Sequence, residues 1–354
     1  MAAMHTRVFR QCTPLAAALL LAACGGDGAV THELTGAAMG TSFSVQVPGD
    51  LSEERRAALA RAVEEAIEGI EQDASTYLLE SDISRFNASR STEWIGVSNA
   101  LCAAVADAIK LSRATDGAFD LTVGPLVNLW GFGPDPAQVR PPPVEDIEAM
   151  RKRIGYERVH ADCARPALRK DKPDVHIDLS AYAKGLAVDV IAELLDDEGV
   201  ENYLVEVGGE LRSRGVNGVG EPWSVAIESP ADGERRVARI LPLSGQAMAT
   251  SGDYRNFFEF EGRRYSHVID ARSGWPTAHE LASVTVIAGR AAFADAMATA
   301  LLVLGPEEGM ALAEREGIAA YFQLRDDGGF SERMSAALEA MLGQGKPSAD
   351  PAPL

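Results

Sequence analysis

The sequence predicts an α+β fold: a single catalytic unit with a mainly antiparallel sheet and packed helices. Helix-like and strand-like segments are interleaved along the 354 residues without the regular strand–helix–strand order of a doubly wound sheet. The chain also lacks a Gly-x-Gly-x-x-Gly loop between a strand and a helix, so a Rossmann fold fits less well. No clear linker divides the middle of the chain, which favours one folded unit.

Four segments have the apolar spacing of a helix with one buried face. Residues 53–71 show it most clearly, with apolar residues from Leu59 to Ile70 at intervals of three or four. Another helix is expected to begin near Ser98 or Asn99, either of which can cap it. Helices are predicted at residues 53–71, 98–115, 183–198 and 291–304.

Short runs of β-branched and aromatic residues predict the strands. Residues 41–47 alternate polar and apolar side chains, as a strand with one buried face does. Residues 284–287 read Val-Thr-Val-Ile and directly precede a predicted helix. Strands are predicted at residues 41–47, 203–207, 223–227 and 284–287.

The first 24 residues have the pattern of an export signal with a lipid attachment site. Arg7 and Arg10 precede an apolar stretch, and small residues lead to Cys24. We expect residues 1–23 to be a lipoprotein signal peptide that is cut before Cys24, whose thiol is then acylated. The apolar stretch is shorter than the ~20 residues of a membrane-spanning helix. An uncut anchor helix and an ordinary signal peptide are the alternatives.

After the expected signal peptide, we predict three parts in the rest of the chain. Residues 24–34 would form a lipidated tether, residues 35–343 the catalytic domain and residues 344–354 a disordered tail. The lipid would hold the mature protein on the periplasmic, extracytoplasmic side of a bacterial cell envelope, and it would be the only contact with the membrane.

The net charge argues against nucleic acid as a partner. The formal charge is −19, and it becomes −21 when the leader with its two arginines is removed. Binding to nucleic acid depends on positive charge that neutralises phosphates. The same acidity argues against a second, electrostatic contact with an anionic membrane. An anionic ligand would need a metal ion or local basic side chains, and Arg255 and Arg272 are candidates for that role.

Two cysteines remain unmodified after the expected maturation. Cys102 falls in an apolar helical stretch and Cys163 in a predicted turn, and they form no Cys-x-x-Cys or Cys–His pattern typical of a metal site. We expect two separate thiols. A disulfide between them is the alternative in an oxidising compartment, because sequence does not fix the distance between the two Cα atoms.

Three runs in the C-terminal third carry groups suited to magnesium-assisted phosphate chemistry. Residues 250–252, Thr-Ser-Gly, are expected to form a nest of backbone N–H groups for phosphate oxygens. Asp295 and Thr299 are four residues apart, so on a helix their oxygens project from one face and can bind Mg²⁺. His267 is a candidate general base. The structural alternatives are an Asp that starts a helix, a Thr bonded to its own helix and a packed His.

Three runs further upstream offer ligand contacts. After a turn, Phe119 and Asp120 present an apolar face beside an acceptor, which suits a nucleobase or a flavin ring. Residues 178–185 join a strand to a helix and would present Lys184 near the helix N-terminus, where anions bind. The paired glycines at residues 208–209 imply a close approach of the backbone. A turn, a helix cap and a bulge are the structural alternatives.

The order of these runs resembles the ApbE family, the FAD:protein FMN transferases. The resemblance spans residues 35–305 and rests on residues 39–41, 77, 116–120, 178–185, 208–210, 250–254, 267–274 and 295–299. It implies an ApbE-like flavin transferase lipoprotein that binds FAD as its substrate together with Mg²⁺. The pyrophosphate of FAD would be split, AMP would leave, and FMN would join a Thr hydroxyl of an acceptor flavoprotein through a phosphoester.

The resemblance also implies roles for individual residues. The expected FAD contacts are Met39, Tyr77, Ala118, Phe119, Asp120, Asp178, Lys184 and Ile269. Mg²⁺ would be held by the side chains of Asp295 and Thr299 and by the carbonyl of Ala181. His267 would take the proton from the acceptor Thr. The implied protein partner is an exported or membrane-bound redox subunit.

Two other activities would use the same residues. A magnesium-dependent FAD pyrophosphatase would let water replace the protein hydroxyl and would release free FMN and AMP. A non-catalytic FAD-binding lipoprotein would store or deliver the intact dinucleotide. The pair formed by Asp295 and Thr299 argues against the passive binder, since such a protein has no need of a metal.

Overall fold

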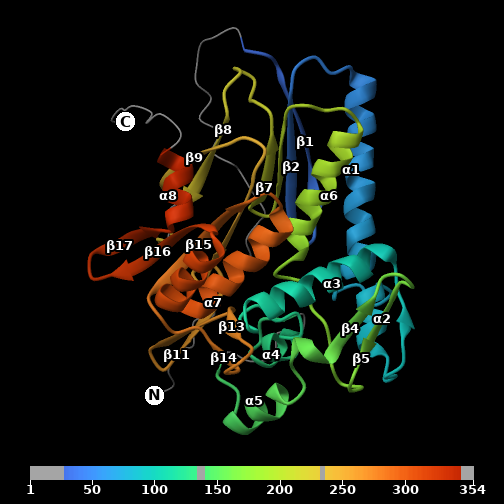
Figure 1. The fold of residues 1–354 in the computed structure, drawn as a ribbon, viewed down its shortest axis with the longest axis vertical. Helices are drawn as coiled ribbons and strands as arrows, with labels where there is room; N and C mark the ends of the chain where they lie inside the picture. Colours follow the sequence, from blue (N-terminus) through green and yellow to red (C-terminus); the bar gives the residue numbers. More distant parts are fainter. Residues whose placement is uncertain (1–27, 134–139, 232–235, 344–354) are drawn as a thin grey trace, which may run out of the picture.

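The core of the molecule is an eight-stranded antiparallel sheet. The structure, a computed structural model, describes residues 28–133, 140–231 and 236–343. The strands follow the spatial order β1-β2-β6-β7-β10-β15-β16-β17, and every neighbouring pair is antiparallel (Figure 1). The predicted α+β class is therefore confirmed. The strands are β1 (Thr31–Ala38), β2 (Thr41–Pro48), β6 (Tyr203–Val207), β7 (Glu210–Arg214), β10 (Ala247–Gly252), β15 (Leu281–Ala288), β16 (Ala319–Asp326) and β17 (Gly329–Met334).

Each face of this sheet has its own hydrophobic core. Helices α1 (Glu53–Ala74), α6 (Ala183–Asp197) and α7 (Ala291–Glu316) pack on one face (Figure 1). The hairpin β8 (Trp223–Glu228)–β9 (Val237–Leu243) and helix α8 (Ala336–Gly343) cover the other face. Strand β6 shows how the alternation serves both cores, because Val205 packs under the helices while Leu204 packs under the hairpin.

A helical lobe packs against α1 and α7. Its small sheet has the order β3-β5-β4, and two further hairpins, β11–β12 and β13–β14, lie between β10 and β15 in the chain. The lobe consists of α2 (Asp82–Ala88), β3 (Ile95–Gly96), α3 (Asn99–Ala114), α4 (Gly124–Leu129), α5 (Val144–Arg151), the 3-10 turn η1 (Tyr156–Arg158), β4 (Val159–Asp162) and β5 (Ala167–Lys170). The hairpins consist of β11 (Phe257–Phe260), β12 (Arg263–Ser266), β13 (Ile269–Asp270) and β14 (Trp275–Pro276).

The predicted helices and strands are present, with small shifts at their ends. Helix α3 is capped by Ser98, whose hydroxyl accepts a hydrogen bond of 2.9 Å from the N–H of Leu101. Helix α7 runs well beyond the predicted end at residue 304, across a kink at Gly305 where φ is 80°. The following Pro306 cannot supply an N–H to a regular helix, so the kink has a local cause.

Among the residues that the structure describes, one helix, α7, is long and apolar enough to cross a membrane. In this molecule, 61% of its most apolar window is buried, against the sheet and against α6. It is therefore a core helix of the fold.

The structure differs from the predicted boundary between the tether and the catalytic domain. Strand β1 begins at Thr31, so the last four residues of the predicted tether, 31–34, belong to the sheet. They pair with residues 45–48 of β2. The predicted signal peptide, Cys24 and the predicted tail, residues 344–354, lie outside the described residues.

The prediction of two separate thiols is wrong, because Cys102 and Cys163 form a disulfide. Cys102 lies on α3, and Cys163 lies in the turn between β4 and β5. Helix α3 packs on β4, which brings the two Cα atoms to 5.7 Å, within the usual range for a disulfide. This distance depends on tertiary packing between segments 61 residues apart, which the sequence pattern did not reveal.

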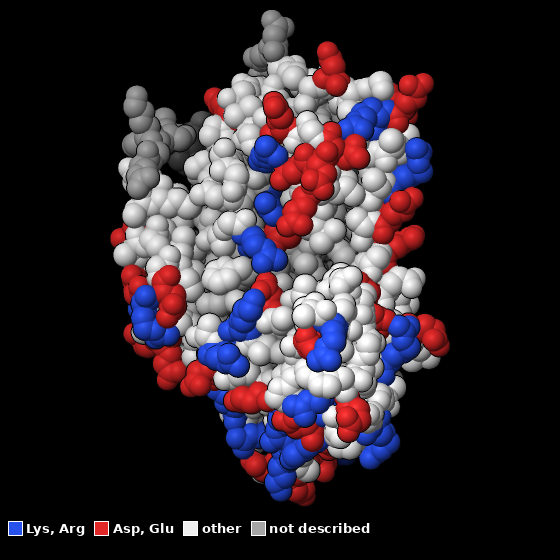
Figure 2. All heavy atoms as spheres, turned by 45° about the vertical axis from the view of Figure 1, so that its right-hand side comes forward, with Lys and Arg blue, Asp and Glu red and all other residues white. Residues whose placement is uncertain are grey.

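The surface carries both signs of charge. On the face shown in Figure 2, Lys and Arg side chains are interspersed with Asp and Glu rather than collected in one continuous area. The acidic excess of the chain is thus compatible with local basic groups, as the site below illustrates.

Candidate functional site

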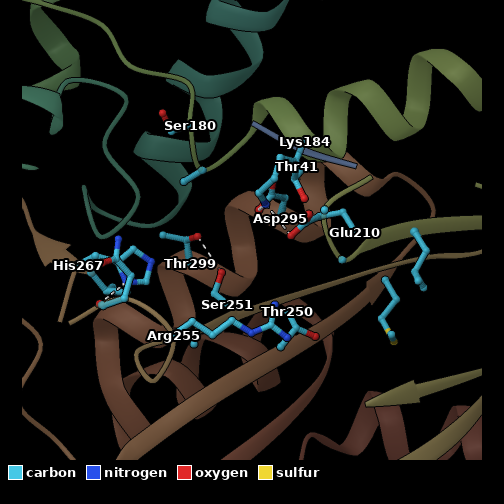
Figure 3. Close-up of a pocket in the computed structure, with 18 of the residues that line it drawn as sticks. Thr41, Ser180, Lys184, Glu210, Thr250, Ser251, Arg255, His267, Asp295 and Thr299 are labelled. Atoms are coloured by element: carbon cyan, nitrogen blue, oxygen red, sulfur yellow. Dashed lines mark hydrogen bonds and ion pairs between the residues drawn. The ribbon is translucent and has the colours of Figure 1, made fainter. Parts of the chain in front are cut away.

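A cavity of about 830 Å³ brings together nearly all residues singled out from the sequence. Its walls come from loops of the helical lobe, the N-terminus of α6, the first turns of α7 and the strands β2, β6, β7, β8 and β10 (Figure 3). Its size is typical of a small-molecule site. The predicted residues that line it are Tyr77, Ala118, Phe119, Asp120, Asp178, Ala181, Lys184, His267, Ile269, Asp295 and Thr299.

A charged cluster with two buried carboxylates occupies one wall. The Nζ of Lys184, from the first turn of α6, lies 2.7 Å from Oε1 of Glu210 and 3.7 Å from Oδ1 of Asp295 (Figure 3). The other carboxylate oxygen of Asp295 accepts a hydrogen bond of 3.1 Å from the N–H of Gly185. Gly185 has no side chain to keep the helices apart, since a Cβ there would lie 2.3 Å from the carbonyl of Ala291. The contact between α6 and α7 therefore places the ammonium group beside Asp295, while Glu210 comes from β7.

The charges in this cluster shift one another's protonation. Burial opposes the charged form of Lys184, but the attraction of Asp295 and Glu210 outweighs it and raises the pKa of the ammonium group. Burial, with repulsion from Asp295, raises the pKa of Glu210 to about 7 despite the opposing effect of Lys184. Oε2 of Glu210 is buried and has no hydrogen-bond partner among the described residues. Such an orphaned oxygen is typical of a site that a ligand completes.

The donors near Asp295 fit a magnesium ion. Thr299 lies one turn further along α7, and its hydroxyl is 2.9 Å from that of Ser251 on β10 (Figure 3). The carboxylate, this hydroxyl and the Ala181 loop line one cavity, and all supply the hard oxygen ligands that Mg²⁺ prefers. The described residues contain no group of three His, Cys, Asp or Glu arranged for a metal. A magnesium site here would therefore depend on one carboxylate, neutral oxygens and its ligand.

His267 is held in the form that a general base needs. Its Nδ1 lies 3.0 Å from the carbonyl oxygen of Asn256, which can only accept a hydrogen bond, so Nδ1 carries the proton. Burial lowers the pKa of the imidazole below its ordinary 6.5, which favours the neutral ring at neutral pH. In this neutral tautomer Nε2 has a free lone pair that can take a proton. His267 lines the cavity on the side away from Lys184 (Figure 3).

A second wall, from the helical lobe, suits a planar ring. Phe119 and Asp120 lie in the turn after α3, and Asp120 accepts hydrogen bonds from the N–H and hydroxyl of Thr122 at 2.8 and 2.6 Å. Burial raises the pKa of Asp120. The neighbouring loop is fixed by Asp178, which accepts bonds of 2.8 and 2.5 Å from the N–H and hydroxyl of Ser180. Apolar surface beside fixed acceptors is therefore present, as expected from the sequence.

Two predicted FAD contacts differ in their placement. Tyr77 is 69% exposed and lines the cavity from the loop after α1, so its ring is available to a ligand. Met39 does not line the cavity. Its N–H donates a 2.7 Å hydrogen bond to Glu71, and its side chain packs between two hydrophobic cores. The role predicted for Met39 thus lacks support from the cavity, whereas Tyr77 remains a well-placed candidate.

The predicted phosphate nest at residues 250–252 is wrong. These residues end strand β10 and pair with Thr285, Val284 and Ser283 of β15. An extended strand points successive N–H groups in opposite directions, so they cannot converge on one anion. Arg255 does line the cavity, while Arg272 is paired with Asp270 at 2.9 Å and does not.

Sequence reasoning gave no role in the site to Glu210, Thr41 or Glu206, although all three lie in or beside the runs that it used. All three line the cavity around the β6–β7 turn. This turn is tight, because Gly209 donates a 2.6 Å hydrogen bond back to Glu206 and both its glycines have positive φ. The spacing of two glutamates around a Gly-Gly turn was the available signal.

The comparisons with known proteins agree on one family. A sequence model of the ApbE family matches residues 39–322. The chain is 41% identical to the FAD:protein FMN transferase of Escherichia coli (strain K12) over 94% of this chain and 97% of that protein. It is 42% identical to the FAD:protein FMN transferase of a Vibrio cholerae strain, over 93% of this chain and 97% of that one.

Solved structures give the same result. The flavin transferase ApbE from Vibrio cholerae superposes with a TM-score of 0.81 at 39% identity, covering 88% of this chain and 99% of that one. The apo form of the flavinyl transferase ApbE from Pseudomonas stutzeri superposes with a TM-score of 0.82 at 41% identity, covering 90% and 98%. On the family match, these identities and these superpositions, the chain belongs to the ApbE family.

Proposed function

We propose that this protein transfers the FMN part of FAD, with Mg²⁺, to the hydroxyl of a Thr in an acceptor flavoprotein and releases AMP. The observation that carries the proposal is one cavity that joins a neutral His267, the oxygens of Asp295 and Thr299, and the apolar wall at Phe119. The names of the relatives, FAD:protein FMN transferase, supply the flavin donor and the protein acceptor.

The chemistry balances without a further reactant. The acceptor Thr oxygen forms a new bond to the FMN phosphorus, and the bond from that phosphorus to the bridging pyrophosphate oxygen breaks. The bridging oxygen and its electron pair leave with AMP. The Thr proton passes to Nε2 of His267, whose Nδ1–H stays bonded to Asn256 and so keeps the ring oriented. Nothing is oxidised or reduced.

Charge balance accounts for the residues of the opposite wall. Asp295, Thr299 and the carbonyl of Ala181 would hold Mg²⁺, which when bound supplies positive charge to the pyrophosphate oxygens. Lys184 holds the carboxylate of Asp295 from one side and Gly185 from the other, so the carboxylate does not need to be reoriented when its ligand binds. The apolar wall and Tyr77 would hold the flavin and exclude water from the phosphorus.

The leader extends the proposal to location. A lipid on Cys24 would hold the enzyme on the periplasmic side of the cell envelope, where exported or membrane-bound redox subunits are available as acceptors. The short connection from Cys24 to β1 at Thr31 would keep the catalytic domain close to that surface.

The proposal is tested with the chain from Gly25 onward, FAD, Mg²⁺ and an exported flavoprotein domain that carries an acceptor Thr. Intact-mass spectrometry should find one FMN unit added to the acceptor. The variant Asp295→Ala should lose at least about 100-fold in rate, because it removes a metal ligand rather than an outer partner. Asp197→Ala, at an exposed carboxylate on the last turn of α6, is the matched control and should retain the rate.

The other outcomes are equally distinct. Free FMN and AMP with an unmodified acceptor would replace the proposal with a FAD pyrophosphatase. Intact FAD, bound by wild type and by Asp295→Ala alike, with no transfer to any of a panel of acceptors, would indicate a passive binder.

A further inference from the structure

Part of the cavity is lined by residues that the proposed function does not assign to FAD, Mg²⁺ or the base. The residues assigned to those groups come from the helical lobe, α6, α7 and the loop around His267. The cavity continues along strand β8, where Ser224, Val225, Ala226 and Glu228 line it. This strand belongs to the two-stranded sheet β8–β9, so the stretch along the cavity is a strand edge.

The backbone N–H and C=O groups of β8 point away from its partner β9 at every second residue. Antiparallel partners alternate between hydrogen-bonded and non-hydrogen-bonded pairs. Ser224 stands opposite Pro242, which has no N–H and so belongs to a non-hydrogen-bonded pair. Two residues further on, Ala226 and Ile240 form a pair of the same kind. The N–H and C=O groups of Ser224 and Ala226 therefore point away from β9, and both residues line the cavity.

This edge can accept another strand. In the part of the chain that the structure describes, β8 pairs with β9 and with no further strand. Ser224 and Ala226 are small and exposed, so they leave room beside the backbone. Folded proteins usually cover or charge such an edge. An open edge inside a ligand cavity is suited to strand addition, in which main-chain hydrogen bonds hold an extended peptide.

The edge of β8 leads to the general base. Its last residue, Glu228, forms an ion pair with Arg255. The next residue in that loop, Asn256, accepts hydrogen bonds from both the backbone N–H and Nδ1 of His267. An extended chain that pairs alongside β8 would therefore run toward His267, the proposed base for the acceptor's proton.

We propose that the acceptor polypeptide binds as an extended strand along the free edge of β8 and so delivers its Thr hydroxyl to His267. The inference rests on the proposed transfer and adds the place and form of the protein substrate. A polypeptide is the fitting occupant because donors and acceptors repeat along the edge at the strand spacing of about 3.3 Å per residue. Recognition through the backbone would also let one enzyme accept segments that differ in side chains.

The test is a pair of matched proline variants. Ala226→Pro removes, at a residue that lines the cavity, an N–H that points away from β9, so the ladder to β9 is left intact. Ile240→Pro makes the same change at the opposite residue, whose N–H faces away from β8 and which does not line the cavity. Transfer to the acceptor domain is followed by intact mass, and FAD binding by flavin fluorescence. We expect the KM for the acceptor to rise about tenfold or more in Ala226→Pro only, with the Kd for FAD within about twofold in both variants.

Backbone-methylated peptides test the same point on the wild-type enzyme. Peptides of the acceptor segment are N-methylated at alternate residues, in two registers, and added as competitors of the acceptor domain. One register should lose inhibition, since its N–H groups face β8, while the other should keep it. An unchanged KM in Ala226→Pro, an equal rise in both proline variants, or equal inhibition by both registers would overturn the proposal. Absence of transfer by the wild type with every acceptor would instead count against the proposed function.

Discussion

Two lysines show how the helical lobe differs from the cavity wall. Lys170 in the lobe is fully buried and donates to three carbonyls, those of Phe86, Asn87 and Val175, at 3.0–3.2 Å. Burial lowers its pKa. Lys184 instead faces two carboxylates that raise its pKa, and one of them, Glu210, keeps an unpartnered buried oxygen.

The difference separates a structural group from a functional one. At Lys170 every ammonium proton has a neutral partner, so the group is complete and joins three segments of the lobe. At Lys184 the charges are paired but the donors and acceptors are not all used, and the cluster borders a cavity. A buried charge therefore indicates a ligand site only where its partners remain incomplete.

The largest expected effect is at the proposed general base, His267, which lies across the cavity from this cluster. His267→Ala should lower the transfer rate by about 10²–10⁴-fold, because it removes the neutral imidazole proposed to take the acceptor's proton. His160→Ala, at a partly exposed His paired with Asp171 on the helical lobe, is the control and should have no effect.

The pH dependence of the wild type tests the same residue. The base must be neutral to work, so the rate should fall as the pH drops through its lowered pKa, with a midpoint below 6.5. A midpoint above 6.5, or a His267→Ala enzyme that keeps the wild-type profile, would contradict the assigned role.

The two lysines should separate stability from activity. Lys170→Met leaves three buried carbonyls without a donor and should lower the free energy of unfolding by about 3 kcal/mol, with little change in the rate of the folded enzyme. Lys184→Met removes a positioning partner of Asp295 and should lower the rate by about 10–100-fold. Urea unfolding and transfer assays on both variants measure the contrast. Equal losses of activity in the two variants would contradict a structural role for Lys170 and a site role for Lys184.

The smallest effect concerns Glu210 and pH. Its pKa is raised from 4.5 to about 7 on folding, so the folded state holds this proton more tightly than the unfolded state. The associated stabilisation is complete below pH 4.5 and is lost as the pH rises through about 7. Relative to Glu210→Gln, the wild type without Mg²⁺ should lose up to about 3 kcal/mol of stability across that window. Parallel curves for the two proteins would show that Glu210 is ionised throughout.

Local patterns predicted the elements well, because their signals lie within a few residues. The apolar spacing from Leu59 onward and the cap at Ser98 both correspond to observed helices. Residues 250–252 were misplaced for a physical reason. Small polar residues favour loops locally, but here the ladder to β15 holds them extended.

The candidate site could be predicted only in part from the sequence. Asp295 and Thr299 share a helix face that spacing alone reveals. The contact of Asp295 with Lys184 joins segments more than a hundred residues apart and depends on the close packing of α6 and α7 at Gly185. The disulfide and the open edge of β8 likewise follow from tertiary arrangement and sheet pairing.

The most direct test of the central claim is the ratio of AMP released to FMN attached. Wild-type enzyme, FAD, Mg²⁺ and an excess of acceptor are sampled over time, with AMP measured by chromatography and bound FMN by intact mass. Transfer to a protein hydroxyl predicts one AMP for each FMN on the acceptor, and no bound FMN when the acceptor Thr is replaced by Ala. AMP that accumulates with free FMN, independently of the acceptor, would contradict the account.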